Sequence, residues 1–248
     1  MYLKKEIELG GRTLTIETGE LAKQADGAVV VRYGDTMVLA TAMMSRDKRA
    51  LPFLPLSCDF VAKTYAAGKI PGGFFKREGR LTEWEVLNSR MIDRPIRPLF
   101  PSGCRNDLQI IAMVLSTDIE NDPANLGLLG ASTALTISDI PWDGPVASLS
   151  VGRINGEFIV NPLASQEEEL ELQFVVAVGR EGSVMVEGEA DYIAEDVLLD
   201  ALMFAQEQAQ PLLDLQEEMA KELKVTKREI ELPEEFPELE KKVAKALA

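Results

Sequence analysis

The sequence has 248 residues, 46% of them hydrophobic and 27% charged, and a formal net charge of -15, as in a globular protein long enough to bury a full core. It contains no histidine, which excludes Ser-His and Cys-His triads, histidine acid–base chemistry and histidine metal ligands within the chain. Its two cysteines support no disulfide framework, and no apolar run approaches the roughly 18 residues that span a membrane, so we expect a cytoplasmic protein without a membrane partner.

The first sixty residues have the pattern of β-structure. Alternating or β-branched runs bounded by turn residues predict strands at Thr13–Thr18, Gly27–Arg32, Thr36–Thr41 and Leu56–Ala62. The dipeptide Gly34-Asp35 lies between the second and third of these runs. It predicts a tight turn that pairs the two strands as a hairpin.

The next stretch predicts a loop that binds nucleic acid. Lys63–Gly73 is polar, contains glycine and has no apolar periodicity, which is typical of a mobile loop. Two adjacent aromatic rings follow in a basic, glycine-flanked sequence, where they are poor candidates for the core. Rings stack on bases of any sequence, while basic side chains follow the phosphate backbone. The candidate RNA-binding residues are Phe74, Phe75, Lys76, Arg77 and Arg80. The alternative is that one ring anchors the loop from beneath.

Positive charge collects in this part of an otherwise acidic chain, with 9 Lys/Arg and 4 Asp/Glu between residues 63 and 105. Thr82 and Glu85 form the pattern of a capping box, so a helix should begin there. We expect it to end at about Arg94, because Pro95 disfavours helical geometry in the residue before it.

Three arginines on or beside this helix, Arg90, Arg94 and Arg97, follow the spacing i, i+4 and i+7. Arg90 and Arg94 are one turn apart and share a face, whereas Pro95 leaves the direction of Arg97 open. Guanidinium groups stay charged and bind phosphate oxygens in pairs, which suits a phosphate site. The spacing fits equally well a solvated helix face in which the arginines pair with Glu83, Glu85 and Asp93.

The remainder alternates strands with helices. A buried strand is expected at Asp107–Ser116 and a helix packed closely on a sheet at Asn125–Ser138. Two hairpins should follow, one turning at Asn155-Gly156 and one at 180–182, and then a helix over Asp191–Leu213. From Leu215 the composition changes to Glu, Lys and Leu. We therefore expect one domain over residues 1–213 and the start of a helical unit over 214–248, which is too short for a core of its own.

Four segments together resemble the polynucleotide phosphorylase family. They are GGFFKREGR at 72–80, RMIDRPIRPLFP at 90–101, GASTALTISDIPWDGPV at 130–146 and VEGEADYIAEDVLLDALMFAQEQ at 186–208. The resemblance covers the amino-terminal part of that family, which is its first ribonuclease PH-like domain and the opening of its helical linker domain. It implies an α+β fold, a β-sheet layered with helices, followed by a short all-α segment.

The resemblance also implies a function. The family degrades single-stranded RNA from the 3′ end in mRNA decay, with inorganic phosphate as co-substrate and magnesium required, and it forms homotrimeric rings. The resemblance further implies that components of an RNA degradosome are candidate partners. By resemblance, Arg90, Arg94 and Arg97 face the phosphorolytic site, and the loop of Phe74 and Phe75 grips the incoming strand.

The resemblance implies that no metal site lies in this chain. The family's second domain has a serine-rich phosphate-binding turn and two aspartates and a lysine around the metal. Here the turn reads NDPANL at 121–126, and Gln173 and Val175 align with the second aspartate and the lysine, while Glu167 lies near the first. The other carboxylates fit turns and solvated surface. They are Asp26, Asp35, Asp118, Asp122 and 167–169.

We therefore expect the chain to grip RNA and form trimers, to be inactive alone, and to leave magnesium to the second domain. Two alternatives remain open from the sequence. One is a self-sufficient enzyme like ribonuclease PH, and the other is a structural ring subunit that binds no RNA.

Overall fold

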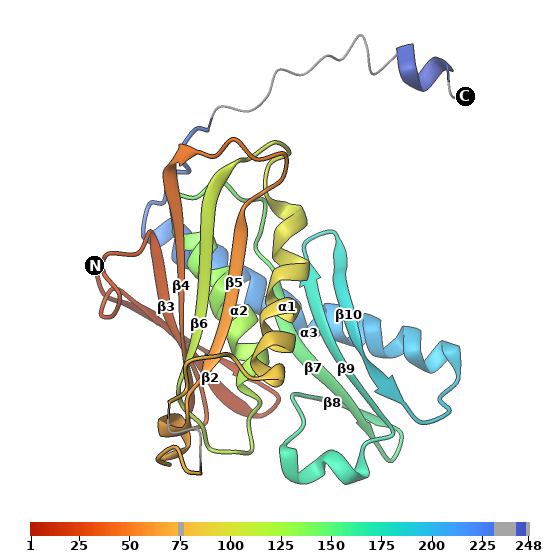
Figure 1. Cartoon of the computed structure of the whole chain (residues 1–248). Helices are drawn as coiled ribbons and strands as arrows, with labels where there is room; N and C mark the ends of the chain where they lie inside the picture. Colours follow the sequence, from red (N-terminus) through yellow and green to blue (C-terminus); the bar gives the residue numbers. More distant parts are fainter. Residues whose placement is uncertain (74–76, 231–241, 247–248) are drawn as a thin grey trace.

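The computed structural model describes residues 1–73, 77–230 and 242–246. Within these residues the chain forms two β-sheets, with helices between and beside them (Figure 1). This is the predicted α+β architecture, divided over two sheets where the resemblance implied one layer.

The first sheet has the strand order β1-β2-β3-β4-β6-β5. Its strands are β1 Leu3–Leu9, β2 Arg12–Thr18, β3 Gly27–Tyr33, β4 Thr36–Lys48, β5 Leu56–Ala62 and β6 Asn106–Ser116. Neighbours are antiparallel, except that β5 runs parallel to β6. All five strands predicted in this part of the chain are present, the fifth being β6, and β1 adds one that was not predicted individually.

The second sheet has the order β10-β9-β7-β8. Its strands are β7 Ala147–Ile154, β8 Glu157–Val160, β9 Leu172–Gly179 and β10 Gly182–Ala190. Short 3-10 turns lie at Thr64–Ala67, Arg97–Leu99 and Ala164–Glu169. The first of these interrupts the predicted loop over Lys63–Gly73.

Two predicted hairpin turns are confirmed by register and backbone geometry. Tyr33 pairs with Thr36 across Gly34, whose φ is 62°. Ile154 pairs with Glu157 across Asn155 and Gly156, whose φ values are 50° and 85°. Positive φ at both central positions is the geometry of a type I′ turn, which asparagine and glycine tolerate best.

Helix α2 (Pro123–Ile137) is the centre of the core. It packs against β3, β4 and β6 of the first sheet, β7 of the second and helix α3 (Glu195–Glu222). All its residues from Ala124 to Thr136 are buried. A Cβ at Gly130 would lie 2.8 Å from the Ala40 methyl, so glycine is what allows this close approach. The predicted close packing of a helix on a sheet is confirmed.

Helix α1 (Glu83–Ile96) begins with the predicted capping box but ends later than expected. Pro95 lies inside the helix, in its last turn, and Ile96 continues it. The missing proline N–H removes one helical hydrogen bond. Ile92 and Ile96 are both completely buried, and this packing outweighs the local preference of the residue before proline.

The prediction of a helix over Asp191–Leu213 is also corrected at both ends, because α3 runs from Glu195 to Glu222. Leu215, Gln216 and Met219 are buried along the same face as Leu212. Within α3, the change of composition after Leu215 therefore affects the exposed face of the helix, while the buried face continues. The predicted boundary at residue 213 falls inside this helix. No helix of the described residues is long and apolar enough to cross a membrane.

Candidate nucleic-acid interface

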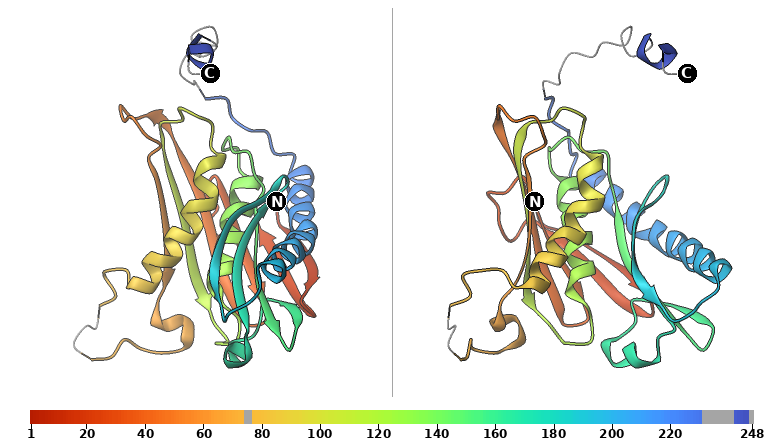
Figure 2. Two further views of the ribbon diagram at one scale, coloured as in Figure 1. Left: turned by 90° about the vertical axis from the view of Figure 1, so that its right-hand side faces the viewer. Right: turned by 45° about the vertical axis from the view of Figure 1, so that its right-hand side comes forward.

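The predicted RNA-binding loop leaves the sheet where β5 ends and returns where α1 begins. Figure 2 shows its described arms projecting beyond this end of the molecule in both views. Arg77 and Arg80 lie on the returning arm, where both side chains are exposed. Neither forms a hydrogen bond or ion pair with a described residue. Phe74, Phe75 and Lys76 lie outside the described residues.

The helix carries two exposed guanidinium groups on one face. Arg90 is exposed and has no ion pair with a described carboxylate. Arg94, one turn later, donates to Glu187 of the edge strand β10 at 2.5 Å, and both side chains are more than half exposed, at 51% and 57%. An exposed ion pair of this kind contributes little to stability. Its arginine therefore remains accessible to a stronger anion.

Arg97 has a different environment from Arg90 and Arg94. Its guanidinium forms two hydrogen bonds with Asp93, at 2.9 and 2.7 Å, and two more with the carbonyls of Leu54 and Leu56, at 3.2 and 3.1 Å. The hydrogen bond to Asp93 raises the pKa of Arg97. Four of its five N–H groups are thus occupied within the protein. Arg97 fixes the end of α1 to the start of β5.

Three of the carboxylates around these arginines have other partners within the protein. Glu85 is buried, with 2% of its surface exposed, and accepts hydrogen bonds from the backbone of Ala62 and Thr82. Glu78 accepts from the Thr64 N–H at 2.9 Å, and Asp93 is occupied by Arg97. The solvated pairing of Glu85 and Asp93 with Arg90 and Arg94 is therefore not formed. Three of the four acidic residues of the basic stretch are engaged elsewhere, which leaves its surface positive.

The turn before α2 is closed by its own side chains. Asp122 caps the helix by accepting from Ala124 N–H at 2.9 Å. Asp118 accepts from Asp35 N–H, Thr36 Oγ1 and Asn121 N–H, and although burial would raise its pKa, these bonds hold the pKa below its ordinary value. The helix N-terminus, where an anion would bind, is thus already occupied by a carboxylate.

The positions aligned with a metal set lie on β9. Gln173 and Val175 pair with Glu189 and Glu187 of β10. Valine offers no ligand atom, and magnesium prefers carboxylate oxygens. Among the described residues, no three His, Cys, Asp or Glu side chains are grouped so that they could hold a metal ion. These residues do not fit a magnesium site.

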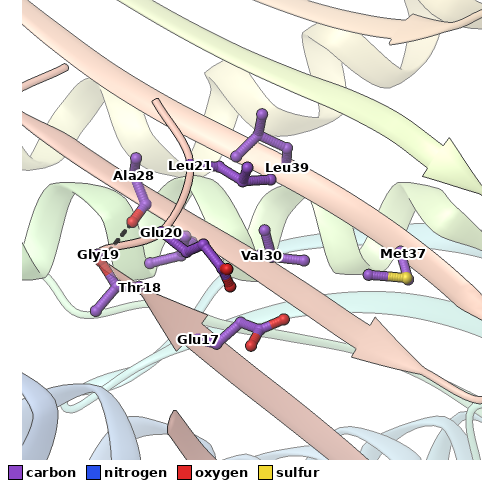
Figure 3. A pocket seen from close by; sticks show the side chains of 10 residues that line it. Glu17, Thr18, Gly19, Glu20, Leu21, Ala28, Val30, Met37 and Leu39 are labelled. Atoms are coloured by element: carbon purple, nitrogen blue, oxygen red, sulfur yellow. Dashed lines mark hydrogen bonds between the residues drawn. The ribbon is translucent and has the colours of Figure 1, made fainter. Parts of the chain in front are cut away.

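A small hollow lies on the face of the first sheet opposite α2, and its lining does not suit an anion. Its volume is about 180 Å³, and Figure 3 shows Leu21, Val30, Met37 and Leu39 in it, with the carboxylates of Glu17 and Glu20 beside them. Apolar walls with acidic residues nearby would repel phosphate. The basic loop and α1 are therefore the better candidate for a nucleic-acid interface.

Sequence reasoning missed the partners of the charged residues. The role of Glu85 beyond its capping box and the contact of Arg94 with Glu187 both depend on tertiary placement. Only the pairing of Asp93 with Arg97 had a local signal, because the two residues are four apart on a helix.

Residues 10–141 match domain 1 of the 3′ exoribonuclease family, and residues 144–208 match domain 2. The polyribonucleotide nucleotidyltransferase of Sorangium cellulosum is 54% identical over 244 residues, which are 98% of this chain and 32% of that protein. The enzyme of the same name from Thermus thermophilus is 51% identical over 243 residues, or 98% of this chain and 34% of that protein. The chain therefore spans about a third of the length of the curated relatives it matches.

Two solved structures share the fold. Rice (Oryza sativa) Rrp46 superposes with a TM-score of 0.66 at 13% identity, covering 90% of this chain and 94% of that one. A chain of the Archaeoglobus fulgidus exosome with RNA bound to the active site gives a TM-score of 0.60 at 14% identity, covering 84% of this chain and 88% of that one. At these identities the likeness is one of fold.

Proposed function

Because the chain belongs to the 3′ exoribonuclease family, we propose that it is the RNA-gripping part of a phosphorolytic polyribonucleotide nucleotidyltransferase. In this proposal the bond-breaking centre lies in the rest of a longer protein. The observation that carries the proposal is the positive surface of Arg77, Arg80 and Arg90, while the nearby carboxylates of Glu85 and Glu78 accept hydrogen bonds from backbone N–H groups instead of pairing with these arginines.

The returning arm of the loop would hold the sugar–phosphate backbone. Arg77 and Arg80 are exposed and have no described partner to exchange, so a phosphate can bind them without displacing a protein group. Phe74 and Phe75 would stack on bases and Lys76 would add a further phosphate contact. Stacking accepts every base, as an exonuclease of broad specificity requires.

Arg90 and Arg94 would contribute to the phosphorolytic site of the second ribonuclease PH-like domain, which belongs to the longer protein and not to this chain. Phosphorolysis brings a phosphate anion to a phosphodiester, so the site must hold like charges together. Two guanidinium groups one helical turn apart offset that charge, and Arg94 would exchange Glu187 for a phosphate oxygen. For Arg97 we propose a positioning role, because its contacts with Asp93, Leu54 and Leu56 hold the helix that carries the other two.

This domain would not catalyse phosphorolysis alone. The turn before α2 is filled by Asp122, and Gln173 and Val175 provide no metal set. Inorganic phosphate would be the co-substrate, and magnesium would be held by the second domain. The alternative of a self-sufficient ribonuclease PH-like enzyme is disfavoured for the same reason.

The whole protein would be a cytoplasmic homotrimer that acts in mRNA decay, with degradosome components as candidate partners. Support for this comes from the resemblance of its motifs to the polynucleotide phosphorylase family. We also propose that the linker domain begins after residue 228. Arg228 still forms ion pairs with Asp26 and Asp139. Because both partners lie within residues 1–213, the chain remains attached to the first domain past the end of α3.

RNA binding tests the proposal against a purely structural ring subunit. The chain should bind single-stranded RNA at low salt, and replacing Phe74 and Phe75 with alanine should abolish most of that binding. Binding that is absent, or unaffected by the change, would favour the structural subunit.

A further inference from the structure

One carboxylate holds both ends of the basic loop. Glu85 Oε1 accepts from the N–H of Ala62, the last residue of β5, at 2.9 Å. Glu85 Oε2 accepts from the N–H and the hydroxyl of Thr82, the N-cap of α1, at 2.6 and 2.9 Å. The two residues that flank the segment 63–81 are thus both hydrogen-bonded to the Glu85 side chain.

The hydrogen bonds of Glu85 restrain both ends of the loop. Glu85 is 2% exposed, and Lys63 Nζ lies 3.9 Å from Oε1. β5 is an edge strand, so the Ala62 N–H has no strand beyond it to pair with, and the carboxylate supplies its acceptor. A charged acceptor strengthens such bonds, and removing it leaves the backbone N–H groups of Ala62 and Thr82 without their protein acceptor.

A second carboxylate joins the two arms farther out. Glu78 Oε1 accepts from the Thr64 N–H at 2.9 Å, and the Glu78 carbonyl accepts from Lys63 Nζ at 3.0 Å. Arg77 directly precedes this point, and Arg80 lies between it and Thr82. The backbone that carries both arginines is therefore fixed by Glu78 and Glu85.

We propose that Glu85, assisted by Glu78, is a positioning residue that holds Arg77 and Arg80 in the geometry that binds RNA. This inference rests on the proposed function that these arginines bind the RNA backbone. A loop ordered before binding loses less conformational entropy when RNA arrives, so affinity increases without a new contact. Glu85 touches no RNA in this scheme and acts through the chain ends it joins.

The sign of the effect separates positioning from simple electrostatics. Glu85 and Glu78 are negative charges beside a phosphate-binding loop, so charge alone predicts that neutralising either one tightens RNA binding. Positioning predicts the opposite. Glu78 is exposed, so its replacement should leave the fold intact, whereas Glu85→Gln also removes part of a buried network.

Ser89 provides a matched control for the loss of stability. It lies one turn after Glu85 on α1, and its hydroxyl accepts from the N–H of Phe60 at 2.8 Å on the same edge of β5. Ser89→Ala therefore breaks an equivalent helix-to-strand contact but leaves the loop ends joined.

The experiment measures thermal unfolding and the affinity for a fluorescein-labelled A12 RNA as a function of salt, with the 248-residue chain. We expect Glu85→Gln and Glu78→Ala to raise Kd about three- to tenfold with an unchanged salt slope, because the phosphate contacts still form after the loop is ordered. Ser89→Ala should lower the melting temperature but change Kd less than about twofold.

Tighter or unchanged binding in both glutamate variants would overturn the inference, as would an equal weakening in Ser89→Ala. Arg77→Ala and Arg80→Ala are measured in parallel. If they weaken binding while the glutamate variants do not, the inference fails and the proposed function stands. If the arginine variants have no effect, the proposed function fails and the inference fails with it.

Discussion

Arg94 near the end of α1 donates to Glu187 on the edge strand β10, and this contact joins residues 93 apart in the sequence. Glu187 lies opposite Val175, the position where the resemblance would require a metal-binding lysine. Arg94 thus contacts the β9–β10 strand pair, which has no metal set of its own, and its partner Glu187 is more than half exposed.

Replacing Arg94 or Arg90 with alanine in the complete protein should reduce kcat more than it weakens RNA binding. An interaction made mainly in the transition state has this signature, and the loss should be about a hundredfold. Steady-state phosphorolysis and RNA titrations measure the two effects separately. Glu187→Gln is the control: it removes the competing carboxylate and should leave kcat unchanged or raised. A loss in Kd as large as the loss in kcat would instead assign the arginines to RNA binding.

Arg77→Ala and Arg80→Ala should weaken RNA binding equally for different homopolymers, because phosphate contacts carry no base information. Each lost contact with a single strand should flatten the slope of log K against log salt by about 0.7. Salt titrations with poly(A) and poly(U) measure this, with Lys23→Ala, an exposed lysine between β2 and β3, as the control. Weakening confined to one polymer would mean that the arginines read bases.

Gly130→Ala should destabilise the fold. Alanine is favoured over glycine in a helix by about 1 kcal/mol, but its methyl would lie 2.8 Å from Ala40 Cβ and 3.2 Å from Val31 Cγ2. We expect a net loss of about 1–3 kcal/mol in urea unfolding. Gly79→Ala, where a Cβ meets no atom within 4 Å, should change stability by less than about 0.5 kcal/mol. A stabilised Gly130→Ala variant would contradict the close packing of α2.

Lys227 should make a contribution to the stability of the domain that rises with pH between about 8 and 10.5. Burial lowers the pKa of Lys227 from 10.5 to about 8, and the negative charge of Asp139 offsets part of this shift by raising the pKa. In that window the unfolded chain binds the proton more strongly than the folded chain, so raising the pH favours folding. Lys227→Met should remove this increase, which chemical denaturation at pH 7.5 and 10.5 would show. Identical pH dependence in both proteins would contradict the lowered pKa.

Much of the fold could be predicted from local patterns. The strands followed from alternation, the two hairpins from Gly34-Asp35 and Asn155-Gly156, and the start of α1 from Thr82 and Glu85. The ends of α1 and α3 could not, because burial of Ile96 and Met219 against the core outweighs the local signals of proline and composition.

The candidate site was predicted in part. Exposure of Arg77, Arg80 and Arg90 agrees with the sequence pattern, but the environment of Arg97 does not follow from spacing alone. Whether a carboxylate neutralises a nearby arginine depends on which backbone donors the fold brings beside it. For Glu85 those donors include Ala62, which is 23 residues earlier in the chain.

The most direct test of the account is the phosphorolysis of single-stranded RNA by the 248-residue chain with magnesium and inorganic phosphate, measured together with its RNA affinity. The account predicts RNA binding that depends on salt and on Arg77 and Arg80, with little or no release of nucleoside diphosphates. Robust, metal-dependent release by the pure chain would contradict the central claim, because the chain would then contain a complete phosphorolytic site.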